Sequence, residues 1–403
     1  MAKGAYIGVN GVARKIKKGY VGVGNVARKI KKAYIGVNGV ARPFWAGGEL
    51  VYYGIVSGVQ FNNQDGKYFE DVAACSNGTH AIFGGGFKYH ANSYGVLDQL
   101  EAFNSSFTKT SAKLSEARGQ LSTGRLGDYA VFAGGRVVPT LNAASKTVDT
   151  YNQSLTRTSP TALDKCSCKM AVANVGNYII FAGGEYHDDY YPVTQASNFA
   201  YGYDKSLTKT SVPNLSSKRA EVSGASVGGQ YAVFLGGITS TSSTATAVNV
   251  VDVYNQSLTK VTTASSLQVK RALSGSVGSY AVFTGGTFGT YYDSATGTYA
   301  SYIYVYDSSL TYSTIKSGLT GYNDTHASAT LDGFLYLSNG NTAKSYDKSL
   351  TCKVLYTNKE NRYCPRAAAA GNFIIEAGGW YYYNDGYMDY QTPAKWIEAF
   401  TIA

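Results

Sequence analysis

An apolar run that ends in glycines recurs along this chain and limits what the chain can fold into. The run appears seven times in 403 residues, and its final glycines are 49, 49, 53, 49, 54 and 39 residues apart. Its copies are 81–86, 130–135, 179–184, 232–237, 281–286, 335–340 and 374–379. A fixed period of this length is typical of repeat architectures, in which each repeat is one small unit that packs on its neighbours.

A second motif follows the apolar run by about 20 residues. It consists of Tyr or Phe, then Asn or Asp, and it ends in Ser-Leu-Thr or Ser-Phe-Thr. Its copies are 103–108, 151–156, 203–208, 254–259, 306–311 and 346–351. Each aromatic residue is expected to close a strand, and the Asn or Asp to begin a tight turn. Because the chain has 46 Gly, 36 Tyr and only 15% charged residues, it predicts many short strands and excludes charge-rich disorder.

The repeat resembles the kelch repeat of β-propellers. The resemblance depends on the Gly-Gly ending, the Tyr-Asp pair and a basic residue before the innermost strand, which is Arg118, Arg219, Arg271 or Arg366. It covers residues 49–403, and kelch repeats have a period of about 50 residues. The usual Trp is replaced by Leu or Phe, and the sixth copy lacks its first glycine. The resemblance implies an all-β, seven-bladed kelch-like β-propeller with four strands in each blade.

The two ends of residues 49–403 are expected to pair. The seventh repeat ends at Ala403, shortly after its third strand at 396–400, so a fourth strand must come from elsewhere. The apolar segment 50–56 belongs to no repeat and is the candidate. This pairing would hide the last exposed strand edges of a ring. Residues 1–48 would then be attached opposite the loops that join the second and third strands of each blade.

Residues 1–48 contain a different repeat, with a period of 14 residues. The sequence Tyr-Ile-Gly-Val-Asn-Gly-Val-Ala-Arg-Lys begins at Tyr6 and returns twice with small changes. Asn-Gly between apolar strands is the strongest short signal for a β-hairpin, so we expect Val9 to pair with Val12. The mostly apolar face of this hairpin comprises Ile7, Val9, Val12, Arg14 and Ile16. A two-stranded unit is marginal in water, so these β-hairpin repeats should pack against copies of themselves or a larger assembly.

The net positive charge of the chain lies in this first region. Ten of the 36 basic residues precede Glu49, the first acidic residue, so the other 26 basic residues match the 26 acidic ones. The repeats resemble those at the start of tail-associated proteins of bacteriophages that infect Gram-positive hosts. The resemblance implies that residues 1–48 bind phage tail or baseplate proteins, or associate into a homo-oligomer such as a trimer. The alternatives are a basic arm for nucleic acid or an anionic membrane, and a solvated sheet edge protected by Lys.

Three long loops carry the candidate binding residues. They join the second and third strands of three repeats, at 185–199, 287–301 and 380–392, and therefore share one face of the predicted propeller. Their aromatic residues are Tyr186, Tyr190, Tyr191, Tyr291, Tyr292, Tyr299, Trp380, Tyr381, Tyr382, Tyr383, Tyr387 and Tyr390. Tyr among Ser, Gly, Asn and Asp is typical of antibody paratopes, because its ring offers a large contact area at low entropic cost. We expect these loops to bind a ligand. The alternative is that the rings pack among themselves.

The sequence has little that indicates an enzyme. Its four His residues are too dispersed for a metal site or a catalytic triad, and its five Cys residues predict free thiols. A carboxylate pair or a Ca²⁺ site formed by Glu185, Asp188 and Asp189 is the one acidic candidate, but adjacent residues on a loop more often point apart. We expect no catalysis, cofactor or bound metal.

These patterns predict a bacteriophage tail-fibre or tail-tip protein that recognises a glycan or protein receptor on a bacterial surface. No apolar run approaches the roughly 18 residues of a membrane span, and the start lacks a signal-peptide pattern. We therefore expect synthesis in the host cytoplasm, a place in the virion, and neither membrane insertion nor nucleic-acid binding. The alternatives are an intracellular kelch-type interaction scaffold and a glycan-active enzyme.

Overall fold

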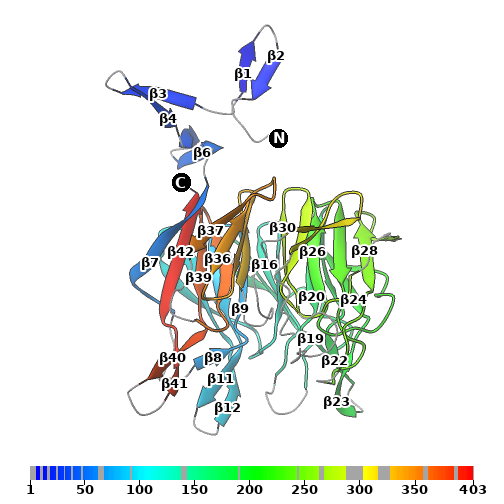
Figure 1. Cartoon of the computed structure of the whole chain (residues 1–403). Coiled ribbons are helices and arrows are strands. Elements are labelled where there is room, and N and C mark those ends of the chain that lie inside the picture. The colour runs from blue at the N-terminus through cyan, green and yellow to red at the C-terminus, as the bar shows by residue number, and fades with distance from the viewer. Residues whose placement is uncertain are drawn as a thin grey trace. The chain divides into compact units, whose positions relative to one another are not determined.

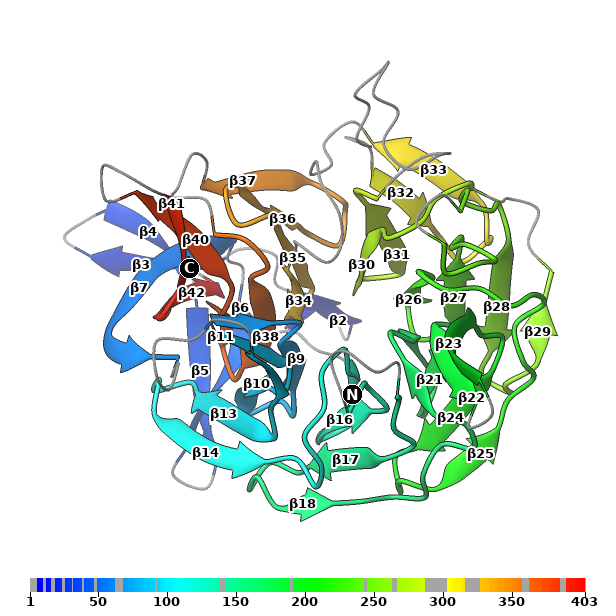
Figure 2. The same cartoon turned by 90° about the horizontal axis from the view of Figure 1, so that it is seen from below.

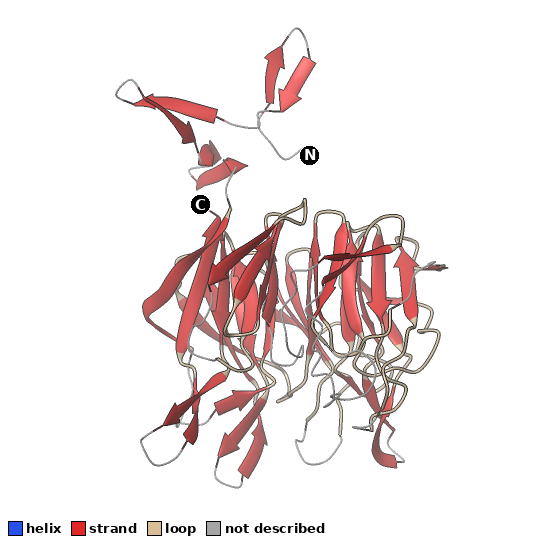
Figure 3. Ribbon diagram, in the orientation of Figure 1, coloured by secondary structure: helices blue, strands red, loops and turns tan. Residues whose placement is uncertain are grey.

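Every regular element in the described part of the chain is a β-strand, so the all-β prediction is confirmed. Figure 3 shows these strands joined by loops. The computed structural model describes residues 6–9, 12–15, 19–23, 26–30, 32–37, 40–46, 49–61, 68–90, 93–137, 143–188, 191–242, 245–262, 267–286, 303–315, 327–356, 362–384 and 389–402. The chain divides into a smaller unit, Met1–Tyr53 with Phe400–Ala403, and a larger unit, Gly54–Ala399.

The smaller unit contains three two-stranded antiparallel hairpins. They are β1 (Tyr6–Val9) with β2 (Val12–Lys15), β3 (Gly19–Val23) with β4 (Val26–Ile30), and β5 (Lys32–Val37) with β6 (Val40–Ala46). Val9 pairs with Val12, as the sequence predicts, and each later hairpin repeats this Val–Val pair at its turn. The Asn-Gly turns themselves and Ile16 lie outside the described residues. The 14-residue period therefore sets the same strand register three times.

The larger unit consists of four-stranded antiparallel sheets that follow one another along the chain. The first sheet has β9 (Ala73–Ser76), β10 (His80–Gly84), β13 (Gln99–Asn104) and β14 (Lys109–Lys113). The second has β15 (Ser122–Leu126), β16 (Tyr129–Ala133), β17 (Val148–Tyr151) and β18 (Arg157–Thr158). The third has β20 (Ala171–Val175), β21 (Tyr178–Ala182), β24 (Ala200–Asp204) and β25 (Lys209–Ser211). In each, the apolar run of the repeat forms the second strand.

The remaining sheets keep this order. The fourth has β26 (Ser223–Val227), β27 (Tyr231–Leu235), β28 (Val251–Asn255) and β29 (Lys260–Val261). The fifth has β30 (Leu273–Val277), β31 (Tyr280–Thr284), β32 (Ile303–Tyr306) and β33 (Tyr312–Ile315). The sixth has β34 (Ala327–Leu331), β35 (Phe334–Ser338), β36 (Ala343–Tyr346) and β37 (Cys352–Tyr356). The last has β38 (Arg366–Ala370), β39 (Phe373–Ala377), β42 (Trp396–Ile402) and, from the start of the chain, β7 (Leu50–Gln60).

The first strands of neighbouring sheets contact one another. This holds for β9 and β15, β15 and β20, β20 and β26, β26 and β30, β30 and β34, and β34 and β38. The first strand of the last sheet, β38, also contacts β9 of the first sheet. Figure 2 shows the sheets in succession around the larger unit, in the order of the chain. Segment 50–56, expected to complete the last repeat, lies within β7.

The core lies between neighbouring sheets and uses both sequence motifs. Phe132 of the apolar run meets Tyr151 of the turn motif edge to face, with ring centroids 5.8 Å apart. The third, fourth and fifth sheets repeat this pair as Phe181–Tyr203, Phe234–Tyr254 and Phe283–Tyr306. The Tyr151 hydroxyl donates to the Lys113 carbonyl of the preceding sheet at 2.5 Å, and burial raises its pKa. Each such Tyr therefore packs against the Phe of its own sheet. In the second to fourth sheets its hydroxyl also donates to a backbone carbonyl in or just after the last strand of the preceding sheet.

At the end of the apolar run, the backbone of another segment lies very close to the paired glycines. Gly134 has a φ of +61°, and a Cβ atom there would lie 2.1 Å from the Ser167 carbonyl oxygen. A side chain would need a left-handed backbone and would also collide with the chain entering the next sheet. This close approach explains the glycine that six of the seven copies have at this position, where the sixth copy has Asn339.

The sheets have two distinct ends. Neighbouring strands are antiparallel, so the first and third strands of a sheet begin at the same end, where the second strand stops. Three extra hairpins project from this end in Figure 1, and we call it the hairpin face. They are β11 (Phe87–His90) with β12 (Ser93–Val96), β22 (Glu185–Asp188) with β23 (Tyr191–Ala196), and β40 (Trp380–Asn384) with β41 (Asp389–Pro393). The Asn/Asp turn motifs follow the third strands at the opposite end, the turn face.

Candidate binding site at the hairpin face

Two of the three loops that we expect to bind a ligand form hairpins at this face. Loop 185–199 contains β22–β23, whose β22 also pairs with β19 (Ser167–Cys168), and loop 380–392 contains β40–β41. A third addition, β11–β12, pairs with β8 (Tyr68–Glu70), and β8 contacts β41. Candidate residues that lie outside the described residues are Tyr190, Tyr291, Tyr292, Tyr299 and Tyr387. The loop at 287–301 is therefore not placed.

The described aromatic side chains are held by contacts within the molecule. Tyr186 is half-buried, donates from its hydroxyl to Gln195 Oε1 at 3.0 Å, and meets Phe199 edge to face at 5.4 Å. Trp380 stacks on Tyr363 with 4.4 Å between ring centroids and 15° between ring planes. For these two rings the contacts agree with the alternative that the aromatic residues pack locally.

Four further candidates are placed by backbone position. Tyr191 lies on β23, Tyr382 and Tyr383 on β40, and Tyr390 on β41. Tyr383 and Tyr390 are partners across the β40–β41 hairpin. Next to them, the Tyr381 ring lies 5.2 Å from that of Trp396 at the start of β42. The described Tyr residues of the last loop therefore lie on one two-stranded extension.

A set of polar residues at this face has a left-handed backbone, which only the structure reveals. Each lies two residues before the first strand of its sheet, and their φ angles lie between 52° and 55°. They are Asp71, Gln120, Lys169, Glu221, Arg271 and Cys364. A left-handed backbone costs a non-glycine residue about 1–2 kcal/mol. Such outliers concentrate at functional sites, where the surrounding structure holds them in place.

Three of these residues belong to a network that joins the first three sheets. Gln120 donates from its side-chain Nε2 to Asp71 Oδ2 at 2.9 Å. The main-chain carbonyl of Gln120 accepts a hydrogen bond from the main-chain amide of Lys169 at 3.2 Å. The Lys169 ammonium donates to Glu185 Oε1 at 3.0 Å. Arg136 donates to the other oxygen of that carboxylate at 2.7 Å. We call these five residues the three-sheet cluster.

The charges of the three-sheet cluster control its protonation. Burial acts to raise the pKa of Glu185, but Lys169 and Arg136 together hold that pKa below its usual value. The neighbouring Cys168, the register partner of Glu185, is buried, and its pKa is raised to about 11 by burial and by the carboxylate. Glu185 is therefore ionised and paired at neutral pH, while the thiol stays protonated and is a poor nucleophile.

Two buried atoms of the cluster have no hydrogen-bond partner, namely Gln120 Oε1 and Arg136 Nε. Their residues are neighbours, because the Gly119 and Arg136 backbones exchange two hydrogen bonds, at 2.9 and 2.7 Å. Unpaired buried polar atoms are uncommon and call for a partner such as water or a ligand. Gln120 Oε1 can only accept a hydrogen bond, and Arg136 Nε–H can only donate one, so a partner for both must donate and accept.

A second cluster of polar residues lies just before the first strands of the fourth and fifth sheets. Arg271 donates to Glu221 Oε1 at 2.7 Å from Nε, while Glu221 Oε2 is buried without a partner. Beside them Lys270 is almost fully buried and donates to the Ala245 carbonyl at 2.7 Å. Burial lowers the pKa of Lys270. This group repeats the left-handed geometry of the three-sheet cluster with different side chains.

The arginines that the sequence groups together occupy different positions. Arg118 and Arg219 are fully buried, and each lies two residues before a left-handed residue. Arg271 is itself the left-handed residue, and Arg366 is the first residue of β38. A third arginine in the same position as Arg118 and Arg219 is Arg362, which lies two residues before the left-handed Cys364 and is 2% exposed. No signal in the local sequence distinguishes these positions, because they differ by only two to four residues.

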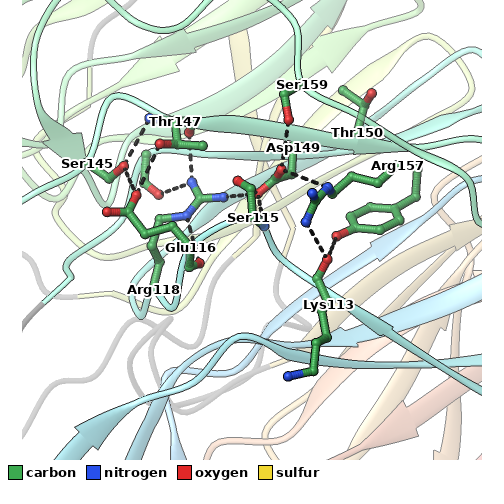
Figure 4. A network of polar contacts seen from close by, with 12 residues as sticks. Lys113, Ser115, Glu116, Arg118, Ser145, Thr147, Asp149, Thr150, Arg157 and Ser159 are labelled. Carbon is green, nitrogen blue, oxygen red and sulfur yellow. Dashed lines mark hydrogen bonds and ion pairs between the residues drawn. The ribbon is translucent and has the colours of Figure 1, made fainter.

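The buried arginines hold the sheets together. Arg118 donates to the carbonyls of Gly134 and Thr147 at 2.6 and 2.7 Å and pairs with buried Asp149 (Figure 4). Asp149 also accepts from the Ser115 amide and hydroxyl, at 3.1 and 2.9 Å. Arg219 repeats this arrangement with Gly236, Val250, Asp252 and Ser216. Both guanidinium groups are buried and paired with a buried carboxylate, so these arginines are structural residues even though Arg219 Nε has no hydrogen-bond partner.

The acidic candidate site is only partly described. Glu185 is engaged by two cations, Asp188 lies on β22, and Asp189 lies outside the described residues. In the part of the chain that the structure describes, no group of three or more His, Cys, Asp or Glu residues has a metal-binding arrangement.

Among the described residues there is also no helix with the length and apolar character needed to cross a membrane.

Two comparisons with known proteins find no match. None of the protein-family models matches the chain, and no curated protein matches it either. The function is therefore inferred from the geometry of the hairpin face together with the sequence repeats.

Proposed function

We propose that the larger unit is a seven-bladed β-propeller. The proposal is supported by the contacts between the first strands of successive sheets, which return from β38 to β9. It is also supported by β7, which gives the last sheet the same four strands as the others. A propeller that closes in this way leaves only short, protected strand edges. The kelch-like repeat of the sequence agrees with this architecture.

We propose further that the hairpin face binds a glycan or protein on a bacterial surface. The observation that carries this proposal is the placement of Tyr-rich hairpins β22–β23 and β40–β41 at one end of a packed sheet scaffold. Rigid scaffolds commonly present recognition residues on such extensions. Tyr residues there give contact area without a large loss of side-chain entropy.

The 14-residue repeats of residues 1–48 support a role as a tail-fibre or tail-tip protein of a bacteriophage. Each repeat forms a separate hairpin with the same register, and no hairpin has a third strand among the described residues. Two-stranded units gain stability from association. We propose that they join tail or baseplate proteins, or other copies of the chain.

A binding experiment tests the proposed recognition face. Labelled full-length protein is measured on a panel of bacterial strains by flow cytometry, beside the variant with Tyr381, Tyr382 and Tyr383 replaced by Ala. Hot-spot aromatic residues typically contribute 2 kcal/mol or more each, so the variant should bind more than 30-fold more weakly. The control is Lys205→Ala at the turn face, where the exposed Lys205 ammonium donates to Asn177 Oδ1 at 2.9 Å.

Two results would contradict the proposal. One is normal cell binding by the Tyr variant together with loss of binding by Lys205→Ala, which would place recognition at the turn face. The other is absence of binding to any strain together with absence of the protein from purified phage particles. Detection of the protein in such particles by mass spectrometry is the expected result.

A further inference from the structure

We propose that the three-sheet cluster binds one neutral, hydroxyl-rich sugar unit of a surface glycan. The inference rests on the proposed function, in which the hairpin face binds a bacterial surface, and it names a ligand class and a subsite. The cluster lies at the base of the β22–β23 hairpin, because Glu185 is the first residue of β22. The cluster is therefore next in sequence to one of the Tyr-rich hairpins that we propose contact the glycan.

The charges of the cluster favour a neutral ligand. Asp71 and Glu185 are acidic, Lys169 and Arg136 are basic, and the ion pairs of Glu185 with both cations are 3.0 and 2.7 Å long. The four formal charges cancel. An anion would compete with Glu185 for the cations, and a cation would compete with Lys169 for the carboxylate. A ligand without charge leaves these pairs intact.

The unpartnered atoms favour hydroxyl groups. Gln120 Oε1 is an acceptor that lacks a donor, and Arg136 Nε–H is a donor that lacks an acceptor. A hydroxyl group both donates and accepts, and a sugar carries several hydroxyls on a rigid ring. The Gln120 amide donates from Nε2 to Asp71, which leaves Oε1 as the atom that a ligand hydroxyl would have to reach.

The backbone positions the two residues before a ligand arrives. Gly119 and Arg136 are paired by two backbone hydrogen bonds, and Gln120 follows Gly119 directly. Gln120 and Lys169 are both held in the left-handed region, at φ angles of 53° and 52°. Glycine would adopt this backbone without strain, so these side chains are retained despite a cost. Glycine could neither make the side-chain bonds to Asp71 and Glu185 nor contact a ligand.

Sugar binding by the intact protein tests the inference. Full-length protein is mixed with glucose, galactose, rhamnose or N-acetylglucosamine, and binding is measured by saturation-transfer NMR. Glucose 6-phosphate and inorganic phosphate are the charged comparators. We expect at least one neutral sugar to bind, and inorganic phosphate not to compete with it. Competition by phosphate at equal concentration would overturn the assignment of a neutral ligand.

Substitution by glycine separates binding from folding. Gln120→Gly should weaken binding of the neutral sugar at least tenfold without lowering the Tm, because glycine suits the left-handed backbone. Glu221→Gly is the matched control, since it makes the same kind of change in the other polar group and should leave sugar binding unchanged. Arg136→Lys keeps the charge but removes the Nε–H at its position, and it should also weaken binding tenfold. Normal binding by both cluster variants would overturn the inference.

The outcomes distinguish this inference from the proposed function. Cell attachment without binding of any neutral sugar would overturn the sugar subsite but leave the recognition face standing. Sugar binding that depends on Gln120 and Arg136, without attachment to cells, would support the subsite and count against the role as a receptor-binding protein.

Discussion

The two ends of the sheets have the same unusual backbone but use it differently. Among the described residues, six at each end are non-glycine residues with φ angles between 52° and 63°. At the turn face they are Phe107, Leu155, Leu207, Leu258, Leu310 and Leu350. At the hairpin face they are the polar set that begins with Asp71 and Gln120. The free-energy cost of the left-handed backbone is similar at both ends, but the side chains that carry it are apolar at the turn face and mostly polar at the hairpin face.

At the turn face, apolar packing offsets the cost. Leu258 and Leu310 are 6% and 7% exposed and belong to the cores of their sheets. The Asn or Asp of each motif also fixes the turn, as Asp204 does by accepting from the amides of Ser206 and Thr208 at 2.8 and 2.9 Å. At the hairpin face the side chains are half-buried or exposed and polar. Apolar packing therefore offsets the strain at the turn face, whereas at the hairpin face the strained residues are not buried in an apolar core.

The largest expected effect comes from the structural arginines, which lie near the hairpin face without belonging to the proposed subsite. Asp149→Ala leaves Arg118 buried and unpaired, so it should lower the free energy of unfolding by about 3–5 kcal/mol. The measurement is urea unfolding followed by circular dichroism. Asp98→Ala is the matched control: the exposed Asp98–Lys113 pair should contribute less than about 1 kcal/mol. Equal effects would show that the Arg118 network is not structural.

The next effect tests the turn face directly. Leu258→Gly removes left-handed strain but also removes a buried side chain, and we expect a net loss of about 2–4 kcal/mol in the free energy of unfolding. Urea unfolding again gives the value. A stability equal to or above that of the wild type would mean that packing does not offset the strain, and the comparison would fail.

A smaller effect depends on pH and concerns Glu185. Its pKa is lower in the folded state than in the unfolded chain, so the carboxylate stabilises the fold above the unfolded pKa of about 4.3. That stabilisation is lost as the pH falls through the folded pKa. Glu185→Gln should therefore be about 1.5–3 kcal/mol less stable than the wild type at pH 7, and the difference should shrink at acidic pH. A difference independent of pH between 7 and 3 would argue against a stabilising carboxylate.

The smallest effect is expected where the strain is retained. Gln120→Gly gains relief of the backbone strain and loses one half-buried hydrogen bond, so the free energy of unfolding should change by less than about 1 kcal/mol. Thermal unfolding of this variant beside Leu258→Gly compares the two ends in one experiment. A loss at Gln120 as large as that at Leu258 would show that both faces are structural.

Part of the site was accessible from the sequence. The Tyr-rich loops stand out by composition, and two of them form hairpins at one face as their shared place in the repeat implies. The three-sheet cluster was not accessible in this way. Gln120, Lys169 and Asp71 have no common residue type, and nothing in a sequence shows that a Gln or Lys has a positive φ. Arg136 and Glu185 meet although they are 49 residues apart, because neighbouring sheets pack side by side.

The sequence by itself determined the strands, their turns and the register of the N-terminal hairpins. These features follow from local patterns, since apolar alternation, Gly-Gly endings and Asn or Asp turns act within one repeat. Two outcomes are visible only in the folded structure: which arginines are equivalent, and which polar side chains meet at the hairpin face. Those outcomes depend on packing between sheets, where a shift of two residues separates buried Arg118 from Gln120 at the proposed subsite.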